Sequence, residues 1–243
     1  MKKLEKIEAF DFNPGRELLR KYRIKKLLGG GWEGEVYLVQ ELATGIERAA
    51  KFFFPHRNPK DSTLKYYAKK LHKLRHCPVI IRYNTQESIT FRRQRVTFLV
   101  SEFVEGELLC DFVARHRGRR LTPFRALHLL HALAEGLESV HALGEYHGDL
   151  HWENIIVQQY GLGFDIKLID FFHWKEYPKP VNIRDDVVDL VKLLYDCIGG
   201  KKHYKNAPPE VKKIICGLKR SMILKKFRTA GQLKEYLENM EWN

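Results

Sequence analysis

A run of closely spaced polar residues lies between apolar segments in the second half of the sequence. Residues 147–154 read His-Gly-Asp-Leu-His-Trp-Glu-Asn and are followed by the apolar residues 155–157, while Asp170 follows a second apolar run. A carboxylate such as Asp149 can accept the proton of an attacking hydroxyl group, and oxygen atoms of Asn154 and Asp170 are suitable magnesium ligands. The spacing predicts that these three side chains converge on one phosphate site.

Glycines cluster between two segments with strand-like composition near the start of the sequence. Residues 29–36 read Gly-Gly-Gly-Trp-Glu-Gly-Glu-Val, which fits the pattern G-x-G-x-x-G-x-V. A dinucleotide-binding loop would open a helix, and a P-loop would end in Gly-Lys-Ser or Gly-Lys-Thr, so neither fits. Missing side chains let backbone N–H groups approach a triphosphate. An ordinary glycine-rich hairpin is the alternative.

A lysine occupies an apolar run shortly after the glycine cluster. Lys51 lies between Ala49-Ala50 and the three phenylalanines 52–54. A buried ammonium group requires an anionic partner to offset its loss of hydration, and nucleotide phosphates would supply one. The alternative is a strand lysine whose charged end reaches solvent.

The hydrophobic periodicity changes between the two halves of the sequence. The first half predicts strands and one helix, the strands at 22–28, 35–41, 46–54 and 97–104 and the helix at 64–74. The second half predicts helices around one small hairpin, the helices at 122–144, 185–198, 209–219 and 229–238 and the hairpin at 154–157 and 166–169. We therefore expect an α+β protein with a strand-rich first lobe and a helical second lobe.

The composition is that of a globular protein with an excess of basic residues. The chain has 243 residues, 44% of them hydrophobic and 30% charged, with a net charge of +13. No apolar run approaches the roughly 20 residues that span a bilayer, and the dispersed cysteines indicate a reducing compartment, so we expect a cytoplasmic protein without a transmembrane segment. Dispersed basic clusters favour solvated surfaces over a nucleic-acid or membrane partner.

The motifs, in this order, resemble those of the protein-kinase superfamily over residues 22–238. The resemblance implies a bilobal fold, with an antiparallel β-sheet and one helix in the N-lobe and a mainly α-helical C-lobe. It implies one domain over residues 1–243, with the N-lobe at about 1–103 and the C-lobe at about 104–243. It also implies ATP and Mg²⁺ as cofactors and a hydroxyl group as phosphoryl acceptor.

The resemblance also implies a role for each residue that matches a family motif. It implies that the catalytic residues are Asp149, His151 and Lys51, and that the metal ligands are Asn154 and Asp170. It implies that the nucleotide is bound by the glycine loop, the strand lysine and a hinge strand, through Gly29, Gly31, Gly34, Val36, Lys51, Glu102 and Val104.

The sequence departs from the usual pattern around the catalytic loop. His-Gly-Asp-Leu-His at 147–151 is similar to the motif of atypical kinases, which include aminoglycoside and choline kinases and small protein kinases such as the RIO type. His151 replaces the lysine that would contact the transferred group. Asp-Phe-Phe at 170–172 replaces Asp-Phe-Gly. The segment 171–185 is short and contains no Ala-Pro-Glu, so the usual docking platform for a peptide substrate is largely absent.

A further departure concerns the helix at 64–74. Its alignment with the family places Tyr67 where an acidic partner of Lys51 is usual, and the helix contains no glutamate. We therefore expect Lys51 to contact phosphate alone or to take a carboxylate from elsewhere, with Glu33 and Asp170 as the candidates.

Three functions are compatible with these motifs. The first is a small, atypical protein kinase that phosphorylates serine or threonine hydroxyl groups of proteins. The second is a kinase of a small molecule or a glycan, such as an aminoglycoside, a sugar or a lipopolysaccharide core. If the acceptor is not a protein, an anionic small molecule suits the basic surface. The third is a pseudokinase that binds nucleotide without catalysis, although retention of Lys51, Asp149, Asn154 and Asp170 together argues against it.

Overall fold

The computed structural model describes residues 5–171 and 177–241. They form two compact units, and the chain passes between them more than once. The first unit comprises the residues up to 76 together with 81–104, and the second comprises 77–80 together with the residues from 105 onward. Within the described ranges, no helix combines the length and the apolar character that crossing a bilayer requires.

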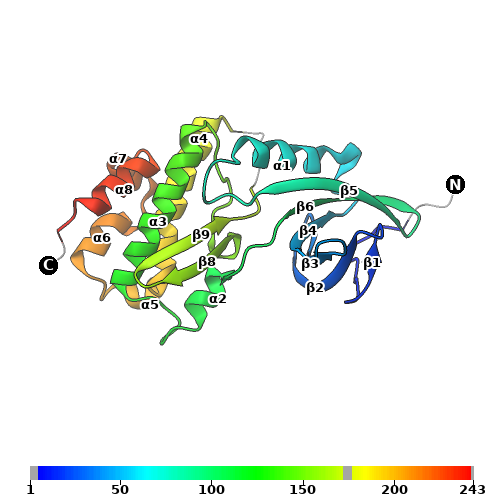
Figure 1. Ribbon diagram of the computed structural model, residues 1–243. Coiled ribbons are helices and arrows are strands. Elements are labelled where there is room, and N and C mark those ends of the chain that lie inside the picture. Colours follow the sequence, from blue (N-terminus) through cyan, green and yellow to red (C-terminus); the bar gives the residue numbers. More distant parts are fainter. Residues whose placement is uncertain (1–4, 172–176, 242–243) are drawn as a thin grey trace. The chain divides into compact units, whose positions relative to one another are not determined.

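The first unit is an antiparallel sheet with one helix (Figure 1). Its strand order is β1-β2-β3-β4-β6-β5, with bounds β1 Glu17–Leu18, β2 Tyr22–Gly30, β3 Gly34–Glu41, β4 Glu47–Phe53, β5 Tyr83–Phe91 and β6 Gln94–Glu102. A short 3-10 turn, η1 (Pro59–Asp61), leads into helix α1 (Ser62–Lys73), which contacts β5 and β6. The predicted strands and helix of this half are confirmed, and β1 and β5 are additions that the sequence analysis missed.

An aromatic segment near the N-terminus covers the core of this sheet. The rings of Phe10 and Phe12 stack on each other and contact Phe52 of β4 and Phe91 of β5, with centroids 5.1–5.8 Å apart. The backbone N–H of Phe12 also donates to the Tyr37 hydroxyl at 3.2 Å. Burial raises the pKa of that hydroxyl, and a hydrogen bond from it to Glu35 raises the pKa further. The segment is therefore part of the folded core.

This packing predicts a moderate effect for the change Phe10→Leu. Leucine keeps an apolar side chain at a position that is 2% exposed, but it removes the ring contacts and some buried area. We expect a loss of about 1–2 kcal/mol in the free energy of unfolding. Urea unfolding would measure it, with Tyr160→Leu at a position 63% exposed as the control. Equal midpoints for the two variants would show that the aromatic segment is not docked.

The second unit is helical, with a small sheet of strand order β7-β8-β9. Its strands are β7 Glu107–Leu108, β8 Ile155–Tyr160 and β9 Gly163–Leu168. Its helices and 3-10 turns are α2 Leu109–Ala114, α3 Pro123–Ala142, η2 Trp152–Asn154, α4 Lys179–Cys197, α5 Gly200–Tyr204, α6 Pro209–Ile215, η3 Cys216–Leu218, α7 Arg220–Lys226 and α8 Ala230–Glu238. Helix α3 packs against α4 and α8 (Figure 1).

Two of the predicted helix starts are confirmed by their caps. The side chain of Thr122 accepts a hydrogen bond from the backbone N–H of Arg125, and Pro123 opens α3. Thr229 caps α8 in the same manner through Gln232. Helix α4 begins at Lys179, earlier than the predicted start at residue 185. The predicted helix at 209–219 is shorter in the structure, because Gly217 has a φ of 61° and α6 ends at Ile215.

Residues 77–80 belong to the second unit although they lie between elements of the first. The backbone N–H of Leu168 donates to the carbonyl oxygen of Val79 at 2.8 Å, and Ile80 forms a parallel bridge with Leu168. Val79 also contacts α3 so closely that a Cβ on Gly136 would lie 2.4 Å from its Cγ1. This short segment therefore fixes the chain after α1 to the core of the second unit.

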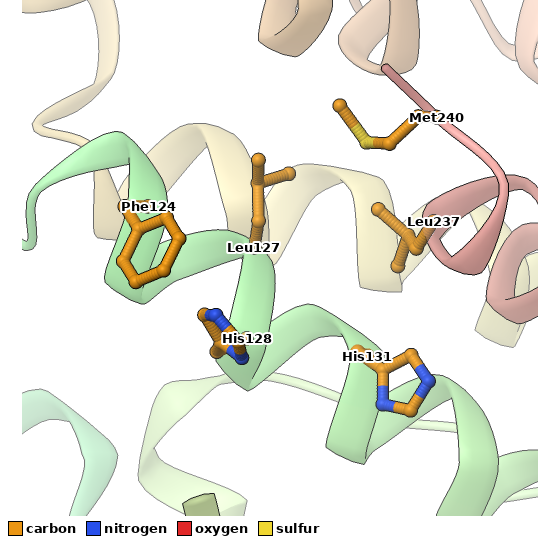
Figure 2. A pocket seen from close by; sticks show the side chains of 6 residues that line it. All are labelled: Phe124, Leu127, His128, His131, Leu237 and Met240. Atoms are coloured by element: carbon orange, nitrogen blue, oxygen red, sulfur yellow. The ribbon is translucent and has the colours of Figure 1, made fainter. Parts of the chain in front are cut away.

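A hollow of about 190 Å³ lies between the start of α3 and the C-terminal end of α8 (Figure 2). It is lined by apolar and imidazole side chains, namely Phe124, Leu127, His128, His131, Leu237 and Met240. None of them is a predicted site residue. The other end of α3 leads to the polar run at 147–154, so the chemistry predicted from sequence lies at the opposite end of this helix.

Candidate active site

The predicted lysine lies in the first unit, where it is paired with an acid. The Lys51 ammonium group on β4 is 3.0 Å from Oε2 of Glu33, and both side chains are mostly buried, with exposures of 14% and 17%. The hydroxyl of Tyr67 on α1 lies 3.2 Å from the same nitrogen, and the ring centroid lies 4.4 Å from it. Of the two alternatives left open for Lys51, the structure contains the carboxylate from outside the helix, and it belongs to Glu33.

The glycine cluster forms the turn between β2 and β3. Gly29 and Gly31 are exposed, and the N–H of Gly31 donates to the carbonyl oxygen of Gly34 at 2.9 Å. A Cβ on Gly34 would lie 1.8 Å from the carbonyl oxygen of Phe52, so only glycine fits where β3 approaches β4. Val36 pairs in register with Lys51. The loop and the lysine are therefore adjacent parts of one sheet, and the role of the loop in covering phosphates stays a prediction.

The predicted hinge residues close the first unit. Glu102 ends β6, and its N–H donates to the carbonyl oxygen of Arg82 at 2.9 Å. Val104 follows it as the last residue of that unit. In the second unit, Gly106 has a φ of 131°, and a Cβ there would lie 2.8 Å from the carbonyl oxygen of Val157. The chain between the units thus passes through a residue that has to be glycine.

The polar run in the second unit is held by one buried carboxylate. Asp186 of α4 is 1% exposed, and it accepts hydrogen bonds from the backbone N–H groups of His147 at 2.7 Å and Gly148 at 2.9 Å. Nε2 of His141 lies 3.0 Å from the same carboxylate. Gly148 has a φ of 88°, which favours glycine, and this fixes the turn that presents Asp149. Burial also raises the pKa of Asp189, one turn further along α4.

A buried histidine connects this loop to the segment that precedes Asp170. The His147 ring is fully buried and its Nε2 donates to the carbonyl oxygen of Ile169 at 2.9 Å, while Nδ1 accepts from the N–H of Asp149 at 3.3 Å. The ring also packs on Phe171 with centroids 4.5 Å apart. His147 therefore sets the spacing between the segments that carry Asp149 and Asp170.

The two predicted metal ligands lie on neighbouring segments of the second unit. The amide nitrogen of Asn154 donates to the carbonyl oxygen of Asp149 at 2.9 Å, so its amide oxygen is the atom that can be offered to a cation. The backbone carbonyl of Asn154 accepts from the N–H of Ile169 at 3.0 Å, which places Asp170 one residue from this contact. Asp170 has a φ of 55°, an unusual conformation for a residue other than glycine, and such conformations concentrate at functional sites. Phe172, the predicted replacement for a glycine, lies outside the described residues.

Two of the predicted catalytic side chains, Asp149 and His151, are close to each other and accessible. Nε2 of His151 lies 3.6 Å from Oδ2 of Asp149, and the two side chains are 41% and 53% exposed. Nδ1 of His151 accepts from the N–H of Glu153 at 3.3 Å, which orients the ring. Asp149 is thus held by its backbone while its carboxylate stays available to a hydroxyl group.

Sequence reasoning missed the two residues that hold the loop. Asp186 was recognised only as part of a helix, and His147 only as part of the motif. The hydrogen bonds that define their roles join residues that are 38 and 22 positions apart in the sequence. Short sequence motifs cannot predict contacts between residues so far apart. The sequence offered no signal that singles out Asp186, because Asp185 and Asp189 lie beside it on the same helix.

A strand-rich unit with a glycine loop and paired lysine, joined to a helical unit with this polar loop, defines a kinase-type domain. The sequence profile of the Protein kinase domain family matches residues 22–204, and the chain belongs to this family. The resemblance noted from sequence and the α+β kinase fold are thereby confirmed.

Individual proteins agree with this assignment. The serine/threonine-protein kinase pkn2 of Myxococcus xanthus is 32% identical over 154 residues, which is 62% of this chain and 18% of that protein. CBL-interacting protein kinase 29 of Oryza sativa subsp. japonica is 30% identical over 169 residues, which is 65% of this chain and 36% of that protein. This chain therefore spans well under half the length of either relative.

A solved structure supports the fold. The crystal structure of the PknI kinase domain of Mycobacterium tuberculosis aligns with a TM-score of 0.66 at 19% identity, and the alignment covers 94% of this chain and 99% of that chain. At this identity the likeness shows the fold alone.

Proposed function

We propose that this chain is an ATP- and magnesium-dependent phosphotransferase that moves a γ-phosphoryl group to serine or threonine hydroxyl groups of proteins. The main observation behind the proposal is the loop held by Asp186, whose carboxylate accepts hydrogen bonds from the backbone N–H groups of His147 and Gly148. This loop holds Asp149 with its carboxylate accessible. The relatives described above, a serine/threonine-protein kinase and a CBL-interacting protein kinase, favour a protein acceptor over a small molecule or a glycan.

Each part of the proposed site has one task. The glycine loop with Val36, Lys51 and the hinge residues Glu102 and Val104 would hold the nucleotide, and Asp149 would accept the proton of the attacking hydroxyl. His151, next to Asp149, would donate a hydrogen bond to the transferred group. We also propose that the two units are the lobes of one kinase domain and that the protein acts in the cytoplasm.

The oxygens of Asn154 and Asp170 fit a magnesium ion. The Asn154 amide nitrogen is used within the loop, which leaves the amide oxygen for a cation, and carboxylate and amide oxygens are the ligands that Mg²⁺ prefers. Magnesium supplies charge neutralisation for the transferred phosphoryl group. Asn154 and Asp170 would hold the ion, and the hydrogen bond between Ile169 and Asn154 keeps their segments together.

The metal assignment predicts that Asp170→Ala weakens nucleotide binding only when magnesium is present. Calorimetry with ATP at millimolar magnesium should show an affinity loss of about tenfold or more. Without magnesium, the variant and the wild type should bind equally weakly. Asp111→Ala, at an exposed position of α2, is the control. Equal ATP affinity of the wild type with and without magnesium would contradict the assignment.

Phosphoryl transfer itself is tested with labelled ATP, a protein mixture and a panel of small hydroxyl acceptors. Label on serine or threonine of a protein supports the proposal. Label on a small acceptor alone would identify a small-molecule kinase, and nucleotide binding without transfer to either would identify a pseudokinase.

A further inference from the structure

The acidic partner of Lys51 comes from the glycine loop. Oε2 of Glu33 lies 3.0 Å from the Lys51 ammonium group, and both side chains are mostly buried. Helix α1, which reads Ser-Thr-Leu-Lys-Tyr-Tyr-Ala-Lys-Lys-Leu-His-Lys, offers no carboxylate. Its Tyr67 instead contacts the ammonium group with both its hydroxyl and its ring. The lysine is therefore held between an acid of the loop and an aromatic residue of the helix.

The loop that carries Glu33 is anchored to the strand that carries Lys51. The N–H of Phe54, just past β4, donates to the carbonyl oxygen of Glu33 at 2.9 Å. The guanidinium of Arg57 lies 3.9 Å above the ring of Trp32, the neighbouring loop residue. On the other side of Glu33, Gly34 touches the backbone of β4 so closely that no side chain fits. These contacts fix the backbone of Glu33 before any ligand arrives.

A carboxylate in a phosphate-covering loop requires a charge partner. An unpaired Glu33 would repel a triphosphate, because like charges in a partly buried site interact strongly. Paired with Lys51, it is neutralised and holds the ammonium group in one position. A lysine has three N–H donors, so Lys51 can keep its bond to Glu33 and also donate to a phosphate oxygen.

We propose that Glu33 is a positioning residue that aligns Lys51 with the nucleotide phosphates, in place of an acid on α1. The inference rests on the proposed function. In protein kinases the corresponding lysine is aligned by an ion pair with a helix glutamate, and the pair breaks when that helix moves. Here the pair lies within the sheet and its hairpin loop, so alignment of Lys51 is independent of any carboxylate on the helix. The same loop both covers the phosphates and orients the lysine.

The first test is a double-mutant cycle on nucleotide binding. Glu33→Gln should weaken magnesium-ATP binding by about tenfold, and the same change should have no effect in a Lys51→Met background. Glu47→Gln, which removes a charge from the exposed start of β4, should leave binding unchanged. Additive effects of the Glu33 and Lys51 changes would overturn the inference. Absence of magnesium-ATP binding by the wild type would overturn the proposed function as well.

The second test is rescue from the helix. Tyr67 reaches the Lys51 ammonium group at 3.2 Å, so a glutamate at this position lies within range of the same nitrogen. Glu33→Gln should lower kcat/KM for labelled-phosphate transfer by about 100-fold, and adding Tyr67→Glu should restore much of the loss. A merely structural role of Glu33 would not allow such restoration. A folded double variant, shown by its thermal transition, that stays as inactive as Glu33→Gln would overturn the inference.

Discussion

Asp149→Asn is expected to lower the rate of phosphoryl transfer by about 10²–10⁴-fold, because the amide cannot accept the proton of the attacking hydroxyl group. The substitution should leave the loop intact. The hydrogen bonds that Asp149 makes within the loop use its backbone: its N–H donates to His147, and its carbonyl oxygen accepts from Asn154. The affinity for magnesium-ATP should therefore change by no more than about twofold.

Single-turnover transfer and calorimetry measure the two quantities separately. Asp165→Asn, an exposed acid on β9, is the matched control and should keep both the rate and the affinity. A variant at position 149 that transfers phosphate at the wild-type rate would show that another group accepts the proton. A variant that loses nucleotide binding as strongly as transfer would instead assign Asp149 to the binding of the nucleotide.

The parts of the site that lie close together in sequence were predictable. Asp149 and Asn154 are five positions apart, and their relation is set by one turn, so spacing was sufficient to group them. Gly34 and Lys51 lie on the antiparallel strands β3 and β4. The strand pattern on both sides of the glycines was sufficient to predict that these two residues lie on neighbouring strands. The pairing of Lys51 with Glu33 was predictable as an alternative, because the absence of acids from the helix left few candidates.

Elements without a local signal were missed. The turn between β5 and β6 consists of Arg92 and Arg93, both with positive φ, where Asn-Gly is the usual signal. The start of α4 at Lys179 was missed because the apolar periodicity of this helix begins several residues later. Lys179 forms an ion pair with Glu145, and a contact between residues so far apart in the sequence leaves no local signal. The aromatic segment around Phe10 has no regular structure at all, and only tertiary packing reveals its place in the core.

Asp186→Ala is expected to lower the free energy of unfolding by about 3–5 kcal/mol. The change removes the hydrogen-bond acceptor of the backbone N–H groups of His147 and Gly148, and it also removes the carboxylate that His141 contacts. Asp186 is 1% exposed, so water cannot easily replace the carboxylate. Phosphoryl transfer should fall together with stability, because the same two N–H groups hold the turn that presents Asp149.

The adjacent acid offers a matched control on the same helix. Asp185 pairs with Arg220 at 2.7 Å, but the two side chains are 44% and 53% exposed. An exposed ion pair contributes about 0–1 kcal/mol, so Asp185→Ala should unfold close to the wild-type urea midpoint. Similar losses for the two variants would indicate a general effect of charge on α4. A stable but inactive Asp186→Ala variant would show that the buried carboxylate shapes the catalytic loop without supporting the fold.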